Sequence, residues 1–198
     1  MDKIENLEII DSLDFRNNKQ QLIMSYLLRL IGVLIFRFLY FLIAKEIYQN
    51  DELIFRDLIE IEIESFPSMV SIILIIIDVI AVIYLHELIH AAVFYFANKQ
   101  KPIIGIRGFI IFAAAPKKVV NKYQMVVNAF APFFVISLVG FLLMAIIPLN
   151  FSSWLFIPMV INASAAAGDF MTVFWILKQP KDTKFIDKGD ITYAYNVK

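Results

Sequence analysis

The sequence of 198 residues contains no cysteine and only two histidines. The absence of cysteine excludes disulfide bonds, thiolate metal ligands and a cysteine nucleophile. Lysine plus arginine and aspartate plus glutamate number 18 each, so the formal net charge is zero. A chain without excess positive charge lacks the general attraction to phosphate that nucleic-acid binding needs, and no nucleic-acid partner is expected.

Apolar side chains dominate the rest of the chain. Hydrophobic residues make up 60% of it, and the mean hydropathy is +0.73. Soluble domains are typically about half apolar, so this composition indicates a protein of the cell membrane with the lipid bilayer around it.

Four apolar segments are long enough to cross roughly 30 Å of hydrocarbon as helices. They lie at about 22–44, 67–97, 125–148 and 153–177. Backbone polar groups in lipid must be paired within each segment, which favours helices. The sequence therefore predicts an all-α membrane protein with one four-helix transmembrane domain at 22–177. Residues 1–21 precede this domain, and a tail at 178–198 follows it.

The distribution of positive charge predicts the orientation. Fourteen of the sixteen lysines and arginines outside the spans fall on the side shared by both termini. By the positive-inside rule, both termini are expected in the cytoplasm. The tail is expected to be a solubilising segment in which "DITYAY", residues 190–195, could form one short strand.

The segment between the second and third spans has an apolar centre that is too short to cross a membrane. This centre, "IIGIRGFIIFAAA", contains Gly105 and Gly108 among β-branched residues, which favours a β-hairpin at about 103–114. The hairpin would be partly re-entrant on the cytoplasmic side, where protein or water covers its backbone. A plain interfacial loop is the alternative.

The second span contains both histidines in the motif "HELIH". His86 and His90 are four residues apart, so a helix places them on one face, about 6 Å apart in height. Two imidazoles in this arrangement can bind one Zn²⁺, and Glu87 can act as a general base on a water molecule at the metal. Polar side chains that bridge packed helices are the alternative, but ionisable residues inside spans usually mark function.

A third zinc ligand must come from another part of the chain. Depth in the membrane favours Asp169 in the fourth span, which lies roughly as far from the outer surface as His86. Asp78 lies about 12 Å above His86 on the same helix and cannot share the ion. We expect Asp78 to form a buried ion pair with Arg29 or Arg37 of the first span instead.

Two asparagines are candidates for binding substrate or stabilising a transition state. Asn128 is expected near the depth of His86, and Asn162 about 10 Å further outward, seven residues before Asp169. Either amide could bind a substrate backbone or polarise a carbonyl. Hydrogen bonding between helices is the alternative, and we favour it for Asn162. The small residues of "NASAAAG", 162–168, would let the fourth span pack closely on the second.

"HELIH" inside a span, "AAAGD" in a later span and an apolar hairpin between them resemble the site-2 class of intramembrane metalloproteases. The sequence also resembles small bacterial membrane proteins grouped as zincin peptidases. The resemblance implies zinc ligation by His86, His90 and Asp169, with Glu87 as the base. It also implies that an extended substrate pairs with the hairpin by strand addition.

We therefore expect a zinc metalloendopeptidase that binds one Zn²⁺ per chain and cuts membrane-embedded or membrane-adjacent proteins or peptides. The alternative is a non-catalytic membrane protein in which a structural or regulatory metal supports partner binding. A metal or proton transporter is disfavoured, because four spans with one ligand cluster near one face offer no evident path.

Overall fold

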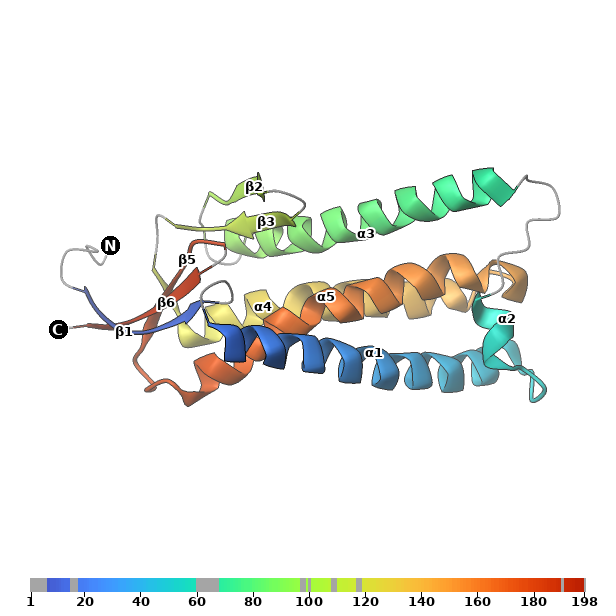
Figure 1. Cartoon of the computed structure of the whole chain (residues 1–198), viewed down its shortest axis with the longest axis horizontal. Coiled ribbons are helices and arrows are strands. Elements are labelled where there is room, and N and C mark those ends of the chain that lie inside the picture. The colour runs from blue at the N-terminus through green and yellow to red at the C-terminus, as the bar shows by residue number, and fades with distance from the viewer. Residues whose placement is uncertain are drawn as a thin grey trace.

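Four long helices form the body of the protein in a computed structural model (Figure 1). They are α1 (Lys19–Tyr48), α3 (Ser68–Phe96), α4 (Lys122–Met144) and α5 (Ser152–Lys178). The structure describes residues 7–14, 18–59, 68–96, 99, 101–107, 110–116, 119–189 and 191–197. Each helix is long and apolar enough to cross a membrane, so the predicted four-span, multi-pass protein is confirmed. Positions 67 and 97, the predicted ends of the second span, lie outside the described residues.

Side chains at the helix starts satisfy N–H groups that have no partner within the helix. Asn18 precedes α1 and accepts hydrogen bonds from the backbone N–H groups of Gln20 and Gln21. Asn121 precedes α4 and forms a reciprocal capping box with Gln124. These caps define where both helices begin, at the left-hand end of the bundle in Figure 1.

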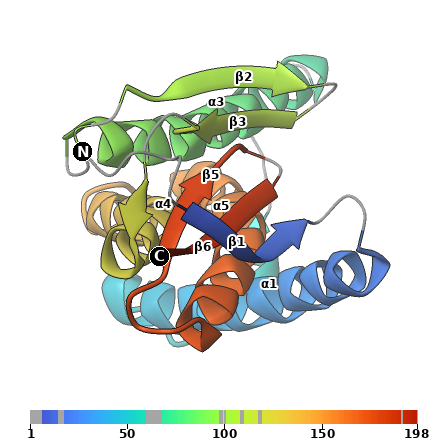
Figure 2. The ribbon, with the colours of Figure 1, turned by 90° about the vertical axis from the view of Figure 1, so that its left-hand side faces the viewer.

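The helices are layered, with α4 and α5 between α3 on one side and α1 on the other (Figures 1 and 2). Helix α5 contacts all three others. Its alanines Ala163, Ala166 and Ala167 are buried, and they allow the close approach of neighbouring helices that the small-residue run predicts. At the end of the bundle away from both sheets, Tyr40 donates a hydrogen bond to the carbonyl of Ser152, beside the short helix α2 (Phe55–Ile59).

The predicted hairpin is present as β2 (Ile103–Arg107) and β3 (Ile110–Ala114). The two strands pair antiparallel and lie against α3 (Figure 2). Gly105 faces Phe112 across the pair, and a Cβ atom on Gly105 would lie 2.6 Å from the Phe112 ring. Glycine at this position therefore makes room for the aromatic ring to lie across the hairpin.

Both terminal segments contribute to a four-stranded antiparallel sheet that the sequence pattern did not reveal. Its strand order is β1-β6-β5-β4. The strands are β1 (Leu7–Asp14), β4 (Val120–Asn121), β5 (Lys184–Asp187) and β6 (Ile191–Val197). The sheet covers the end of the bundle beside the hairpin (Figure 2). The tail is thus a structured part of the domain, and only its last strand matches the expected "DITYAY" strand.

An apolar cluster attaches this sheet to the helices. It contains Val120, Met125, Ile176, Phe185 and Ala194, all of them buried. Because these residues come from α4, α5 and three strands, the sheet and the adjacent helix ends share one core. The sheet is therefore held close to the polar side chains near this end of the bundle.

Candidate metal centre

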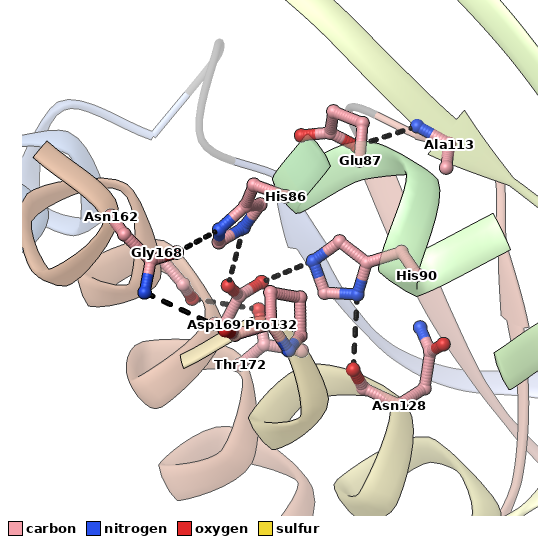
Figure 3. Close-up of polar contacts among 10 residues, drawn as sticks. All are labelled: His86, Glu87, His90, Ala113, Asn128, Pro132, Asn162, Gly168, Asp169 and Thr172. Carbon is pink, nitrogen blue, oxygen red and sulfur yellow. Dashed lines mark hydrogen bonds and ion pairs between the residues drawn. The ribbon is translucent and has the colours of Figure 1, made fainter. Parts of the chain in front are cut away.

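His86 and His90 lie on one face of α3, and both rings are buried and point toward α5 (Figure 3). Their four-residue spacing on a continuous helix produces this arrangement. Asp169 of α5 lies opposite them. The Nε2 atom of His86 is 3.1 Å from Asp169 Oδ2, and the Nε2 atom of His90 is 3.4 Å from Asp169 Oδ1. The structure thus brings together the three side chains that the sequence analysis proposed as ligands.

The matched depth that pointed to Asp169 has a simple origin in the helix lengths. His90 is six residues from the end of α3 at Phe96, and Asp169 is nine residues from the end of α5 at Lys178. At 1.5 Å per residue, both lie roughly 9–14 Å from the helix ends beside the sheets. Because the two helices pack against each other, similar depth becomes direct proximity.

The second ring nitrogen of each histidine is held by a hydrogen bond. His90 Nδ1 lies 3.0 Å from the main-chain carbonyl oxygen of Asn128, and His86 Nδ1 lies 2.9 Å from the side-chain Oδ1 of Asn162. A carbonyl oxygen only accepts, so each Nδ1 is the donor. The Asn162 amide is oriented by its Nδ2 group, which donates to the carbonyl of Pro132 at 3.5 Å. In a neutral ring this leaves the lone pair on Nε2, facing Asp169.

These atoms fit a divalent metal ion. One donor atom from each of the three residues lies within 4.8 Å of the other two. Ligands at 2.0–2.1 Å around tetrahedral zinc are roughly 3.4 Å apart, close to the distances found here. Asp169 Oδ2 is buried without a hydrogen-bond partner among the described residues. Three lone-pair-bearing atoms that converge in this way repel one another until a cation lies between them.

Glu87 projects to a different side of α3 and reaches the hairpin. Its Oε2 accepts a hydrogen bond from the backbone N–H of Ala113 on β3, at 2.8 Å (Figure 3). Ala113 pairs with Ile104 of β2, but its N–H donates to Glu87 and therefore points away from β2. The carboxylate therefore binds β3 along the edge that faces α3, opposite the edge that pairs with β2.

The two asparagines have different positions. Asn162 forms a hydrogen bond with His86, although the sequence analysis expected it about 10 Å further outward. This bond joins α3 to α5, as expected if Asn162 serves in hydrogen bonding between helices. Asn128 contributes its backbone carbonyl to His90, while its buried side-chain Oδ1 has no hydrogen-bond partner among the described residues. Both residues thus act on the histidines in this structure, whereas direct contact with substrate remains a prediction.

The expected ion pair of Asp78 is wrong. Helices α1 and α3 lie on opposite sides of α4 and α5, which separates Asp78 from the arginines of the first span (Figures 1 and 2). Arg37 instead lies over the Phe55 ring at 3.5 Å, and Arg29 lies 5.7 Å from the Tyr26 ring. Among the described residues, no ion pair of Asp78 is present. Helix order, which the sequence does not reveal, decided this outcome.

Asp187 is an acidic residue near the site that the sequence analysis missed. It ends β5, and its Oδ1 accepts a hydrogen bond from the Gly189 N–H at 2.7 Å. Burial raises the pKa of Asp187 to about 7, and the nearby carboxylates of Asp169 and Glu87 act in the same direction. The Gly189 N–H opposes this rise in pKa, as would a positive charge on the His90 ring. No sequence signal could identify it, because 97 residues separate it from His90.

A comparison with protein families supports the chemistry of this centre. The model of a family described as "Putative zincin peptidase" matches residues 79–184, which is more than half of the chain. The match includes α4, α5, the hairpin and most of α3. It covers His86, Glu87, His90, Asn128, Asn162 and Asp169. No curated protein and no solved structure matches the chain.

Proposed function

Because the chain belongs to this zincin peptidase family, we propose that it is a zinc-dependent intramembrane endopeptidase, with a membrane-embedded or membrane-adjacent protein or peptide as substrate. The observation that carries the proposal is the convergence of His86, His90 and Asp169 within a bundle of apolar, membrane-length helices. Glu87 adds an acid–base group one residue from the first histidine.

His86, His90 and Asp169 would hold the zinc ion, through the two Nε2 atoms and the carboxylate. Bound zinc lowers the pKa of a water molecule and polarises the peptide carbonyl. Glu87 would accept the proton of the attacking water and pass it to the leaving amine nitrogen. The hydrogen bond of this carboxylate to the hairpin edge supports such a role, because an extended substrate would lie along the same edge.

The hairpin supports an extended substrate conformation. A helical peptide keeps its carbonyls in internal hydrogen bonds, so the scissile bond must be unwound before attack. Strand addition to β2 or β3 would hold the chain extended while its backbone groups stay paired. The resemblance to the site-2 class supports this mode, as does the position of the hairpin against α3. The positive-inside pattern supports access of water from the cytoplasm.

Zinc content is the first test. The protein is purified in detergent and analysed for metal beside Asp169→Ala, Glu87→Gln and Asp78→Ala. We expect about one zinc per chain in the wild type, its loss in Asp169→Ala, and its retention in the other two. Asp78 is the matched control, because it is an acidic residue of the same helix as both histidines but lies about 12 Å from His86. A wild type that neither contains nor takes up zinc contradicts the proposal.

Hydrolysis is the second test. Fluorescently labelled casein, an unfolded protein, is offered in detergent micelles as an extended substrate. The wild type should cleave it, and Glu87→Gln should reduce the rate by about 10²–10⁴-fold with zinc still bound. Equal rates for both would exclude Glu87 as the base. A zinc-loaded wild type without activity on casein or on membrane-spanning peptides would instead favour the structural or regulatory metal.

A further inference from the structure

Pro132 is a buried residue inside α4, in the layer that faces both histidines. Proline has no backbone N–H, so it cannot donate to the carbonyl four residues earlier in a helix. In α4 that carbonyl belongs to Asn128. The proline ring also crowds this carbonyl and tilts it away from the helix axis. Asn128 therefore presents a carbonyl oxygen without its usual helical partner.

His90 uses this freed carbonyl. Its Nδ1 lies 3.0 Å from the Asn128 oxygen in a buried contact between α3 and α4. Prolines are tolerated in membrane helices because neighbouring helices satisfy the backbone groups that they free. Here the neighbouring group is the imidazole of a proposed metal ligand, and the bond leaves Nε2 unprotonated toward Asp169.

Pro132 also contacts Asn162, the residue that holds the other histidine. The Pro132 carbonyl accepts a hydrogen bond from Asn162 Nδ2 at 3.5 Å, and Asn162 Oδ1 lies 2.9 Å from His86 Nδ1. Figure 3 shows Pro132 below the centre, with Asn162 and His86 on one side and His90 with Asn128 on the other. Pro132 is thus connected to both imidazoles. It leaves the Asn128 carbonyl free to accept from His90, and its own carbonyl accepts from Asn162, which contacts His86.

We propose that Pro132 is a positioning residue of the metal centre, which fixes the orientation and tautomer of His90 through the freed Asn128 carbonyl and supports His86 through Asn162. The inference rests on the proposed function only in that a metal ion occupies the site. Outer groups that orient metal-binding histidines typically contribute about 10–100-fold to metal affinity.

The test is Pro132→Ala, which restores an N–H that competes with His90 for the Asn128 carbonyl. Zinc affinity is measured by competition with a chelator on the full chain in detergent. We expect it to fall about 10–100-fold, while the metal-free protein keeps its melting temperature within a few degrees. Pro158→Ala is the matched control, because Pro158 also lies inside a helix, α5, and contacts neither histidine through a hydrogen bond. It should leave zinc affinity unchanged.

A second variant separates the backbone of Asn128 from its side chain. Asn128→Ala keeps the carbonyl and should retain zinc affinity to within about threefold. Equal affinity in Pro132→Ala and wild type would overturn the inference, as would a comparable loss in Pro158→Ala or Asn128→Ala. A wild type that binds no zinc overturns the proposed function instead, and this inference with it.

Nuclear magnetic resonance of the wild type provides a measurement that does not depend on any variant folding. Only two histidines occur in the chain, so ¹⁵N-labelled histidine produces few ring signals. In the zinc-loaded protein, both Nδ1 atoms should carry protons that exchange slowly with water, and both Nε2 atoms should bear the metal. A His90 ring that binds metal through Nδ1 would overturn the inference.

Discussion

The carboxylate of Glu87 on α3 accepts a hydrogen bond from the main-chain N–H of Ala113 on β3, at 2.8 Å. This contact joins the candidate base to the hairpin that would hold substrate. Since the N–H lies on the edge of β3 away from β2, a peptide that adds to this edge must share or displace the contact. Binding of a peptide to this edge of β3 is therefore expected to change the position of the Glu87 carboxylate.

Ala113→Pro tests this coupling. Proline removes the N–H that Glu87 uses, and this N–H donates to Glu87 and not to β2, so the pairing of the two strands keeps its hydrogen bonds. Peptide hydrolysis should fall by about 10-fold or more as the carboxylate loses its fixed position, while zinc content stays at the wild-type level. Ala113→Gly keeps the N–H and should retain most activity. A variant Ala113→Pro with full activity would show that the contact does not orient the base.

Asn162→Leu should weaken zinc binding by about 10–100-fold, because His86 loses the acceptor for its Nδ1–H and can change tautomer. Chelator competition measures the effect. Asn121→Ala is a suitable control: Asn121 caps α4, so its loss should cost about 1 kcal/mol of stability without a change in zinc affinity. Similar zinc affinities for Asn162→Leu and wild type would contradict a role for the amide in holding His86.

Gly189→Ala should destabilise the contact between the terminal sheet and the hairpin. Gly189 has a φ of +95°, and a Cβ atom there would lie 2.6 Å from the Phe112 ring. The strained backbone and the clash together should cost about 1–3 kcal/mol, measured as a lower melting temperature. Gly32→Ala is the control, since the nearest atom to its added Cβ is 3.9 Å away. If both variants melt at the wild-type temperature, Phe112 does not pack on this turn.

The raised pKa of Asp187 predicts a pH dependence of stability in the metal-free protein. The folded state holds a proton on this carboxyl up to about pH 7, whereas the unfolded chain releases it near the ordinary aspartate pKa of 3.8. Folded protein therefore binds more protons, and stability falls as the pH rises from about 4 to about 7. In Asp187→Asn this contribution is absent, so its melting temperature should fall less between pH 5 and pH 7.5. Parallel curves for the two proteins would show that Asp187 titrates normally.

The spans, the hairpin and the grouping of His86, His90 and Asp169 could be predicted because each depends on local spacing or on depth. Twenty or more apolar residues specify a membrane helix, and four-residue spacing puts His86 and His90 on one face whatever surrounds them. Asp169 followed from its depth along a second helix. The terminal sheet was not predicted, because β1 and β6 pair residues nearly a full chain length apart, although "DITYAY" in β6 indicated one strand.

The sequence by itself therefore determined that this is a membrane protein with a histidine pair, a glutamate and an aspartate suited to zinc. Tertiary structure alone decided which groups orient them. Helix order separated Asp78 from its expected arginines, and the packing of α3 on α4 joined His90 to the carbonyl that Pro132 frees. Such contacts depend on the rotation and offset of packed helices, and these are set by the fit of side chains across the whole bundle.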